Sequence, residues 1–530
     1  MTTPEPSAPA PGRRYAAAAA LVVLFALGLR AFHAADRDAI WRDEGQDIAI
    51  VDGAGSLGEL WATLAVEGAP PLHYVAEYAV VRAFGHGIGA RRALSVAGGT
   101  LAVAAVIALG RFAFGPTCGL LAGLLAATSP FLVYYSGEIR SYALAALLGA
   151  LHALALLRLL ARPGPGRAAA WGAAAALLAY THYFAFHVVA VAGVAALATL
   201  RRRGLVPCAI AGGVFLALYA PWLPTFVGQL GQDLTPWAQP DPLLRRAFLV
   251  FKLPFGEDGQ FLAALGLVLA WCRTRRGPFQ ALLALGLAAG APAGAVQLFT
   301  APYTPRYLMR MAVVLLPPAC DYWARRLDAS RGRALLPWAA VVLLVALQWT
   351  ETPRWLRPAS GAAEAARIVE AEGRPGDLVW VHPATMGSSF FHHYGGDLPA
   401  VTPPYDGRHV RIDWARYMHD QTPERAEAQI ARLRDHLRGG GRVWLVALGE
   451  RRVPAAWAFD PRTAPQRDRA PMLLAGAIFR RRVMQVLHEE GVDDAFWSWP
   501  LHRFHEPVTL TRFRPRGPDE PFVRPEAHAR

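Results

Sequence analysis

Lysine is almost missing from this sequence of 530 residues: Lys252 is the only one, so the 54 basic residues are nearly all arginine. Charged residues of both signs are scarce, at 18% of the chain. Hydrophobic residues make up 54% and the mean hydropathy is +0.24, which excludes an ordinary soluble enzyme. Although the formal net charge is +14, no basic stripe is interleaved with aromatic residues, so the sequence argues against nucleic-acid binding.

Cysteine is scarce as well, and its spacing excludes two kinds of site. The four cysteines lie singly, with no CxxC pair and no Cys/His spacing typical of a metal site. The sequence therefore predicts neither a disulfide framework nor a zinc centre. They are Cys118, Cys208, Cys272 and Cys320.

Long apolar runs are what the chain has in quantity. Runs of roughly 17 to 25 residues recur, the length needed to cross about 30 Å of hydrocarbon. The first run follows Arg13-Arg14 and has no convincing cleavage site, so we interpret it as a retained signal anchor. Arginines in the short loops orient the rest, with a disordered cytoplasmic tail at 1–14 and eleven spans in all. The first four are expected at about 15–35, 92–112, 117–136 and 142–160.

The segment between the first two spans, 36–91, is predicted to lie outside the membrane. Within it, 70–85 is short for a span and contains Glu77 and Arg82. Reading it as a span would also invert every later loop. We therefore expect it, and 55–68 before it, to be helices lying at the outer interface.

The sequence pattern changes at about residue 355, from long apolar runs to shorter helix and strand patterns. "AARIVEAEGRPGDLVWVHP" and "PERAEAQIARLRDHLRGGGRVWLVAL" each predict a helix, a turn and a buried strand, and "VTLTRFRP" predicts a closing strand. The fold class is thus a polytopic α-helical membrane domain, 15–354, with the external loop 36–91. A soluble α/β domain, 355–530, follows outside. His392-His393 are expected at its surface.

Charge is concentrated where the first apolar run ends. Seven of the twelve residues in "DRDAIWRDEGQD" (36–47) are charged. Ionisable residues at membrane depth cost about 2.5–3.5 kcal/mol each, so each is a functional hypothesis by default. The predicted topology gathers the following residues at the outer face: Asp43, Glu44, His73, Glu138, Arg140, Tyr142, His182, Tyr183, Arg306 and Tyr307.

Each of these residues also has a plainer interpretation. The acidic cluster could be a solvated loop, and Glu138 with Arg140 could be a turn pair that reaches to water. His182 lies among aromatic residues, where it could anchor the chain at the interface. Arg306 could be a charge that only sets topology. No single motif decides between these readings.

The order of the motifs is more specific than any one of them. An acidic pair after the first span, then "PPLHY", "SPFLVYYSGEIRSYAL", "YTHYF" and "PRYL", resembles the GT-C type membrane glycosyltransferases. Within these the chain looks like bacterial glycosyltransferase family 39, related to protein O-mannosyltransferases and aminoarabinose transferases. The resemblance covers about 15–325 and is sharpest over 41–160. The family often has His where Ala69 stands, and Gln where Gly137 stands.

The resemblance implies transfer of a sugar from a polyprenyl-phosphate donor lipid to an acceptor at the outer face of the cytoplasmic membrane. The acceptor could be a protein, a lipid or a cell-wall glycan. The family's acidic pair matches Asp43 and Glu44, with Asp43 as the catalytic aspartate. The other residues named above would bind the donor's phosphate and sugar.

The chemistry of such a transfer suits these residue types. A hydroxyl or amine acceptor needs a base, and a positioned carboxylate supplies about 10²–10⁴ in rate. A phosphate leaving group needs positive charge, for which the guanidinium groups of Arg140 and Arg306 are candidates. One base with direct displacement predicts inversion at the anomeric carbon, by analogy with inverting glycoside hydrolysis. Asp43 and Glu138 are also candidate ligands for Mg²⁺ or Mn²⁺, since both ions prefer oxygen.

Two other classes of protein compete with an enzyme. A secondary transporter would show repeat symmetry or broken helices near mid-membrane, whereas these charges cluster at one face and the sequence shows no repeat. A non-catalytic, polysaccharide-binding membrane protein would have no reason to gather Asp43, Glu138, Arg140 and Arg306 there.

Overall fold

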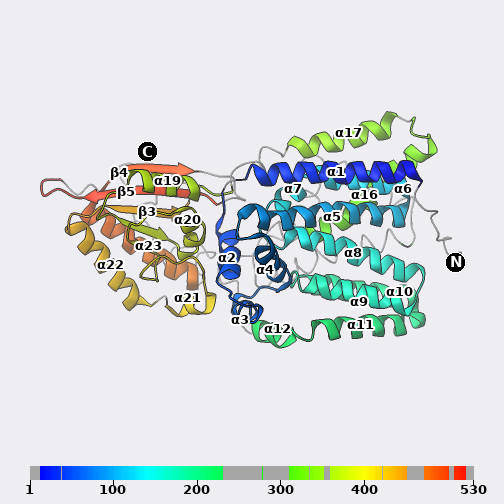
Figure 1. Ribbon diagram of the computed structural model, residues 1–530, viewed down its shortest axis with the longest axis horizontal. Helices are drawn as coiled ribbons and strands as arrows, with labels where there is room; N and C mark the ends of the chain where they lie inside the picture. The colour runs from blue at the N-terminus through cyan, green and yellow to red at the C-terminus, as the bar shows by residue number, and fades with distance from the viewer. Residues whose placement is uncertain are drawn as a thin grey trace. The chain divides into compact units, whose positions relative to one another are not determined.

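In the computed structural model of the chain, the described residues are 12–37, 39–230, 277, 309–333, 335–350, 359–420, 422–449, 471–499 and 506–520. The chain divides into two compact units. We call the first the membrane unit; its described residues are 12–36, 68–230 and 309–350. The second, the sheet unit, comprises 37–67 and the described residues from 359 onward. Figure 1 labels the helices and strands of both.

Helices make up the membrane unit. They are α1 (Arg13–Ala35), α4 (Leu72–Phe84), α5 (Ile88–Phe114), α6 (Pro116–Thr128), α7 (Pro130–Ser136), α8 (Tyr142–Ala161), α9 (Pro165–Ala179), α10 (Ala185–Leu200), η1 (Arg201–Gly204), α11 (Leu205–Tyr219), α12 (Leu223–Leu230), α16 (Met309–Ala329) and α17 (Leu335–Thr350). α5, α6, α8 and α16 pack on one another around a continuous apolar core (Figure 1).

Several of these helices are long and apolar enough to cross a membrane. Among the described residues there are four: α1, α5, α8 and the stretch Ala185–Tyr219, which η1 divides into α10 and α11. The α6–α7 pair would be a fifth. The chain is therefore a multi-pass membrane protein. The first four predicted spans coincide with helices, although α1 already begins at Arg13, inside the predicted tail. The count of eleven stays a prediction, because the eighth and ninth spans lie outside the described residues.

The third predicted span is not one straight helix, and this corrects the sequence analysis. α6 and α7 meet at Ser129–Pro130, where the axis bends by 62°. Ser129 is extended (φ −61°, ψ 114°), as expected for a residue that precedes proline. Pro130 has no N–H for the helical ladder, so the helix restarts there.

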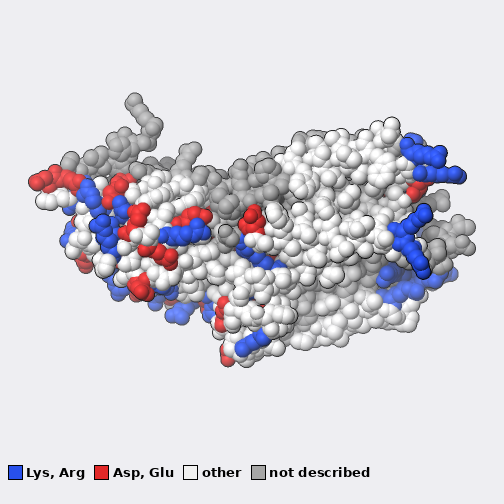
Figure 2. Space-filling view, turned by 45° about the horizontal axis from the view of Figure 1, so that its top comes forward, with Lys and Arg blue, Asp and Glu red and all other residues white. Residues whose placement is uncertain are grey.

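Arginines gather at one end of the membrane unit. Figure 2 shows blue groups at that end, beside a body that is almost free of charge. The turns α8–α9, α10–α11 and α16–α17 carry exposed arginines, namely Arg162, Arg167, Arg201, Arg202, Arg203, Arg331 and Arg333. This is the charge pattern from which the topology was predicted.

The sheet unit contains a five-stranded sheet in the order β2-β1-β3-β5-β4. β1 is parallel to β2 and β3, while β5 is antiparallel to β3 and β4. The strands are β1 (Leu378–His382), β2 (Ala400–Val401), β3 (Val443–Leu448), β4 (Gly491–Trp499) and β5 (Val508–Pro515). The helices are α2 (Arg42–Asp52), α3 (Leu57–Glu67), α19 (Ala362–Glu372), η3 (Ala384–Met386), α20 (Gly387–His393), α21 (Trp414–Asp420), α22 (Pro423–Arg438) and α23 (Pro471–Glu490).

Helices cover both faces of this sheet, which explains why β1 and β3 are almost wholly apolar. α22 and α23 pack on the face that carries Trp380 and Leu445, and α19 and α20 on the face that carries Val381 and Trp444. Parallel strands buried on both sides read as continuous hydrophobic runs. β1, β3 and β5, together with α19 and α22, confirm the elements predicted from sequence.

The predicted external loop, 36–91, contains two expected helices and one that was not expected. Helices were expected at 55–68 and 70–85, and α3 and α4 lie there. The charged stretch before them is not an irregular loop, because Arg42–Asp52 forms α2. The domain boundaries differ too: 37–67 was grouped with the membrane domain but belongs to the sheet unit. The side chain of Gln46 explains this, since it donates to the carbonyl of Ile412 at 2.7 Å and accepts from its N–H at 2.8 Å.

Candidate active site

Asp43 lies in the first turn of α2. Trp41 is extended (φ −97°, ψ 167°) and the helix starts with the next residue. Acidic side chains in a first turn favour the helix because they face its unsatisfied N–H groups. The Asp43 side chain is 23% exposed, and its Oδ1 lies 3.8 Å from Nε of Arg42. Asp43 is therefore a partly exposed carboxylate.

Glu44, its neighbour in the predicted acidic pair, is placed quite differently. Its side chain is fully buried. Oε2 lies 3.3 Å from Nη2 of Arg37 and accepts a hydrogen bond from the N–H of Trp41 at 3.4 Å. These contacts hold the start of α2 in place. The catalytic role of Glu44 stays a prediction, and the geometry favours a positioning role.

Three of the predicted motifs meet within the membrane unit. His73, from "PPLHY" on α4, hydrogen-bonds the main chain of Ile139 and lies within electrostatic reach of Arg140. The N–H of Leu72 donates to the carbonyl of Tyr180 at 3.0 Å. The start of α4 therefore joins the turn after α7 to the turn after α9. These are the segments that the sequence analysis assigned to one outer face.

The turn after α7 presents Glu138, Arg140 and Tyr142. Glu138 and Tyr142 are 1% and 3% exposed, and the guanidinium carbon of Arg140 lies 5.9 Å from the centre of the Tyr142 ring. A Cβ on Gly137 would lie 3.0 Å from Cδ2 of His33. Gly137 is the second of the two departures from the family, and a glutamine there would require His33 to shift.

His182 and Tyr183 occupy the turn between α9 and α10. The His182 ring stacks on Phe184 with 5.2 Å between centres, and its Nδ1 accepts from the N–H of Phe184 at 3.3 Å. The Tyr183 hydroxyl is hydrogen-bonded to Gln229 and accepts from Nε1 of Trp222 at 2.9 Å. Both side chains are half-buried in an aromatic cluster. Arg306 and Tyr307 lie outside the described residues.

A buried charge cluster on α4 and α5 was missed by the sequence analysis. Glu77 is ion-paired with Arg91, and its Oε2 lies 3.5 Å from Nε2 of His73. All three side chains are at most 2% exposed. The signal was present, since His73 and Glu77 are four residues apart and so share one helix face. The cluster fixes His73 beside the turn that carries Arg140.

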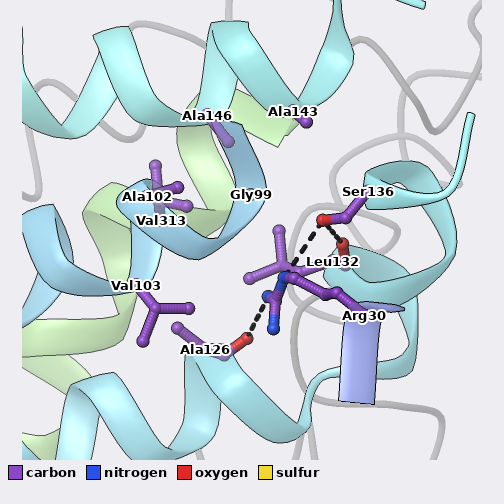
Figure 3. A pocket seen from close by; sticks show the side chains of 10 residues that line it. All are labelled: Arg30, Gly99, Ala102, Val103, Ala126, Leu132, Ser136, Ala143, Ala146 and Val313. Atoms are coloured by element: carbon purple, nitrogen blue, oxygen red, sulfur yellow. Dashed lines mark hydrogen bonds between the residues drawn. The ribbon is translucent and has the colours of Figure 1, made fainter. Parts of the chain in front are cut away.

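A second missed residue is Arg30, hidden inside the first apolar run. Figure 3 shows its guanidinium in a small cavity, directed at Ser136 and at the end of α6. Nε donates to Oγ of Ser136 at 3.1 Å, and Nη2 donates to the carbonyl of Ala126 at 3.0 Å. Because a helix C-terminus leaves carbonyls unsatisfied, this arginine caps α6 just before the bend. Gly99 makes the room, since a Cβ there would lie 2.0 Å from Oγ of Ser136.

We searched the described part of the chain for a metal site. No group of three His, Cys, Asp or Glu side chains is arranged there to share a metal ion. The Mg²⁺ or Mn²⁺ site predicted at Asp43 and Glu138 stays a prediction, and we derive no step through a metal.

The chain is similar in fold to proteins whose structures are known. No family model and no curated protein matches the chain. Among solved structures, ArnT from Cupriavidus metallidurans bound to undecaprenyl phosphate matches with a TM-score of 0.57 and 15% identity. The match covers 93% of this chain and 97% of that one. The chain has the GT-C fold.

Two further solved structures match the chain. ArnT in the apo state matches with the same TM-score of 0.57 and 15% identity, covering 93% of this chain and 98% of that one. The apo form of the Archaeoglobus fulgidus oligosaccharyltransferase matches with a TM-score of 0.49 and 12% identity. That match covers 82% of this chain and 69% of the other.

Proposed function

We propose that this chain is an integral membrane glycosyltransferase that moves a sugar from a polyprenyl-phosphate carrier to an acceptor. The observation that carries the proposal is the fold match along nearly the whole of ArnT, whose structure holds undecaprenyl phosphate. A long isoprenoid phosphate is a donor that only a membrane enzyme meets. The residue types at the site supply the chemistry that such a donor needs.

Asp43 acts as the general base. Its carboxylate takes the proton from the acceptor's hydroxyl or amine as that oxygen or nitrogen bonds to the anomeric carbon. At the same time the bond from the anomeric carbon to the phosphate oxygen breaks, and polyprenyl phosphate leaves with the electron pair. A single displacement of this kind inverts the anomeric carbon. The partly exposed carboxylate of Asp43 supports this role, whereas the buried carboxylate of Glu44 supports the helix.

Positive charge stabilises the leaving phosphate. Arg140 is the candidate among the described residues, because planar guanidinium matches phosphate oxygens and the surrounding residues fix the turn that carries it. Arg306 is a second candidate. We assign His73, Glu138, Tyr142, His182, Tyr183 and Tyr307 to the donor's headgroup and sugar.

The transfer takes place at the outer face of the cytoplasmic membrane. The exposed arginines of the turns α8–α9, α10–α11 and α16–α17 support a cytoplasmic position for that end of the membrane unit. The α4 start and the α7–α8 turn then face outward. We also assign the C-terminal domain to the outside, from the sequence alone. The acceptor is a protein, a lipid or a cell-wall glycan of that compartment.

Donor turnover tests this function. Purified protein is given polyprenyl-phosphate sugars, and the release of polyprenyl phosphate is followed for wild type and Asp43→Asn. We expect Asp43→Asn to lose about 10²–10⁴ in kcat while it folds normally. Asp52→Asn, an exposed aspartate at the end of the same helix, is the matched control and should retain activity. Equal turnover by wild type and Asp43→Asn would remove the base from the mechanism.

A further inference from the structure

The helix that carries Asp43 docks on one particular edge of the sheet. β1 ends at His382 and leads through η3 into α20, while β3 ends at Leu448. Because β5 is antiparallel to β3, with Leu448 opposite Val508, the segment entering β5 lies at the same edge. The carboxyl edge of parallel strands is where α/β sheets gather functional groups.

Close packing fixes α2 at this edge. Oγ of Ser388 on α20 donates to the carbonyl of Arg42 at 2.8 Å, and the N–H of Ile40 donates to Nε2 of His393 at 3.1 Å. His393 is thus half-buried against the first loop and not simply at the surface, as the sequence suggested. A Cβ on Gly45 would stand 2.4 Å from the carbonyl oxygen of Ser388, so only glycine permits this approach.

Glu506 is a buried carboxyl group at the same edge. It is 3% exposed and lies directly before β5. Its Oε2 accepts from the hydroxyl of Ser360 at 2.7 Å, and its main-chain N–H donates to the carbonyl of Ala359 at 2.9 Å. The hydroxyl of Ser389 also interacts with this carboxyl. The second oxygen of Glu506, Oε1, lies 3.9 Å from Nε of Arg42.

Arg42 therefore stands between two carboxyl groups. Its Nε is 3.8 Å from Oδ1 of Asp43 and 3.9 Å from Oε1 of Glu506. Burial raises the pKa of Glu506; the positive charge of Arg42 and the hydroxyls of Ser360 and Ser389 oppose that rise, and the charge of Asp43 adds to it. A buried carboxylate costs free energy unless a positive charge pairs with it, so the charge of Glu506 calls for a partner. Arg42 is that partner, and Arg42 adjoins the proposed base.

We propose that Glu506 is a positioning residue for sugar transfer, which fixes the orientation of Asp43 through Arg42. The inference rests on the proposed function and extends it, because it makes the sheet unit part of the catalytic apparatus. Ser360 holds Glu506, Glu506 holds Arg42, and Arg42 holds the carboxylate of Asp43 toward its substrate. Without Glu506, Arg42 follows Asp43 alone and the carboxylate is less firmly directed.

Steady-state kinetics of Glu506→Gln test this chain of contacts. The amide keeps the size of the side chain and an acceptor for Ser360 but removes the charge that faces Arg42. We expect kcat to fall between about 10-fold and 100-fold, as for a small misplacement of a catalytic group, with the donor KM unchanged. Arg42→Gln should lose a similar factor, and the double variant should lose little more, since both act through one link. Glu506→Asp, which keeps the charge, should recover part of the loss.

The control is Glu427→Gln, which also removes a glutamate paired with an arginine in this unit, here the exposed Glu427–Arg482 pair. It should leave kcat unchanged. A wild-type kcat for a folded Glu506→Gln protein, or fully additive losses in the double variant, would overturn the proposal.

Hydrogen exchange keeps the inference separate from the proposed function, because it needs no substrate. The amides of residues 45–48 in α2 should exchange faster in Glu506→Gln than in wild type or Glu427→Gln. If wild type turns over no polyprenyl-phosphate sugar, the proposed function fails while faster exchange still supports the tether. Unchanged exchange in Glu506→Gln overturns the tether whatever the turnover.

Discussion

Two buried carboxylates, one in each unit, are held in opposite ways. Glu77 in the membrane unit is enclosed by Arg91 and His73, both equally buried. Glu506 in the sheet unit has one oxygen bonded to Ser360 and the other directed at Arg42, whose side chain is 37% exposed. A charge paired entirely inside the protein serves the fold. A charge whose partner reaches the surface beside a candidate base serves the site.

Removing Glu77 should produce the largest effect. Glu77→Gln leaves Arg91 buried without its counter-charge, and breaking a buried pair costs about 3–5 kcal/mol. We expect a strong fall in the melting temperature of the purified protein, measured by tryptophan fluorescence in detergent. The double variant Glu77→Gln/Arg91→Met should recover much of that loss. If Glu77→Gln melts as wild type does, the pairing is not structural and the contrast with Glu506 fails.

Gly45→Ala should come next, and its effect should be confined to the sheet unit. The new Cβ meets the main-chain carbonyl of Ser388, which has no rotamer to escape into. Overpacking costs about 1–3 kcal/mol, and we expect the upper end, together with loss of turnover as α2 moves from its edge. Gly58→Ala on α3 is the matched control, because its Cβ would meet only Oγ of Ser56, at an ordinary contact distance of 3.9 Å. Normal turnover by Gly45→Ala would show that α2 does not need this edge.

Gly99→Ala is the equivalent test in the membrane unit, where the new Cβ would meet a side chain and not the main chain. Its Cβ would meet the side chain of Ser136, which rotates away at the cost of its bond to Arg30. We expect the free energy of unfolding to fall by about 1–2 kcal/mol. This loss is smaller than for Gly45→Ala, because a side chain moves aside more easily than the main chain does. Gly28→Ala on α1, with nothing near its Cβ, is the control. A larger loss for Gly99→Ala than for Gly45→Ala would reverse the order we derive.

Lowering the pH should produce the smallest effect on stability. It acts through Asp377, a carboxylate of the sheet unit that accepts several hydrogen bonds. Burial raises the pKa of Asp377, but hydrogen bonds from Arg442, Trp444 and the N–H of Arg374 outweigh it and leave the pKa below its usual value. A lowered pKa contributes stability above the unfolded value, about 3.9, and loses it as the pH falls through the folded value. The melting temperature of wild type should therefore fall below about pH 4. Asp377→Asn should lack that component and exposed Asp435→Asn should keep it; identical pH profiles would contradict the assignment.

The sequence predicts local structure well where one residue type fills a segment. β1 and β3 were expected because "LVWV" and "VWLVAL" are apolar throughout, and both strands are buried on two faces. α2 was missed because its charged residues suggested a loop. Ile48, Ile50 and Val51 are nevertheless buried and form the apolar face of this helix. The bend after α6 was missed although Pro130 was in plain view.

The candidate site was predictable only in part, for a reason of distance along the chain. Asp43, Arg140 and His73 belong to motifs whose order carries a resemblance. Glu506 belongs to none, and its partners Ser360 and Arg42 are 146 and 464 positions away. Contacts of that separation are fixed by the fold and leave no periodicity to read.

The proposed contact between Arg42 and Glu506 joins residues that the ribosome makes far apart in time. The ribosome makes Arg42 464 residues before Glu506, which at about 5–20 residues per second is roughly 20 to 90 seconds. The contacts of α2 with Ser388 and Ile412 become available earlier in that interval, and the contact with Glu506 comes after them. A chain that stops short of Glu506 therefore carries every motif of the acidic segment but lacks the residue that we propose orients Asp43.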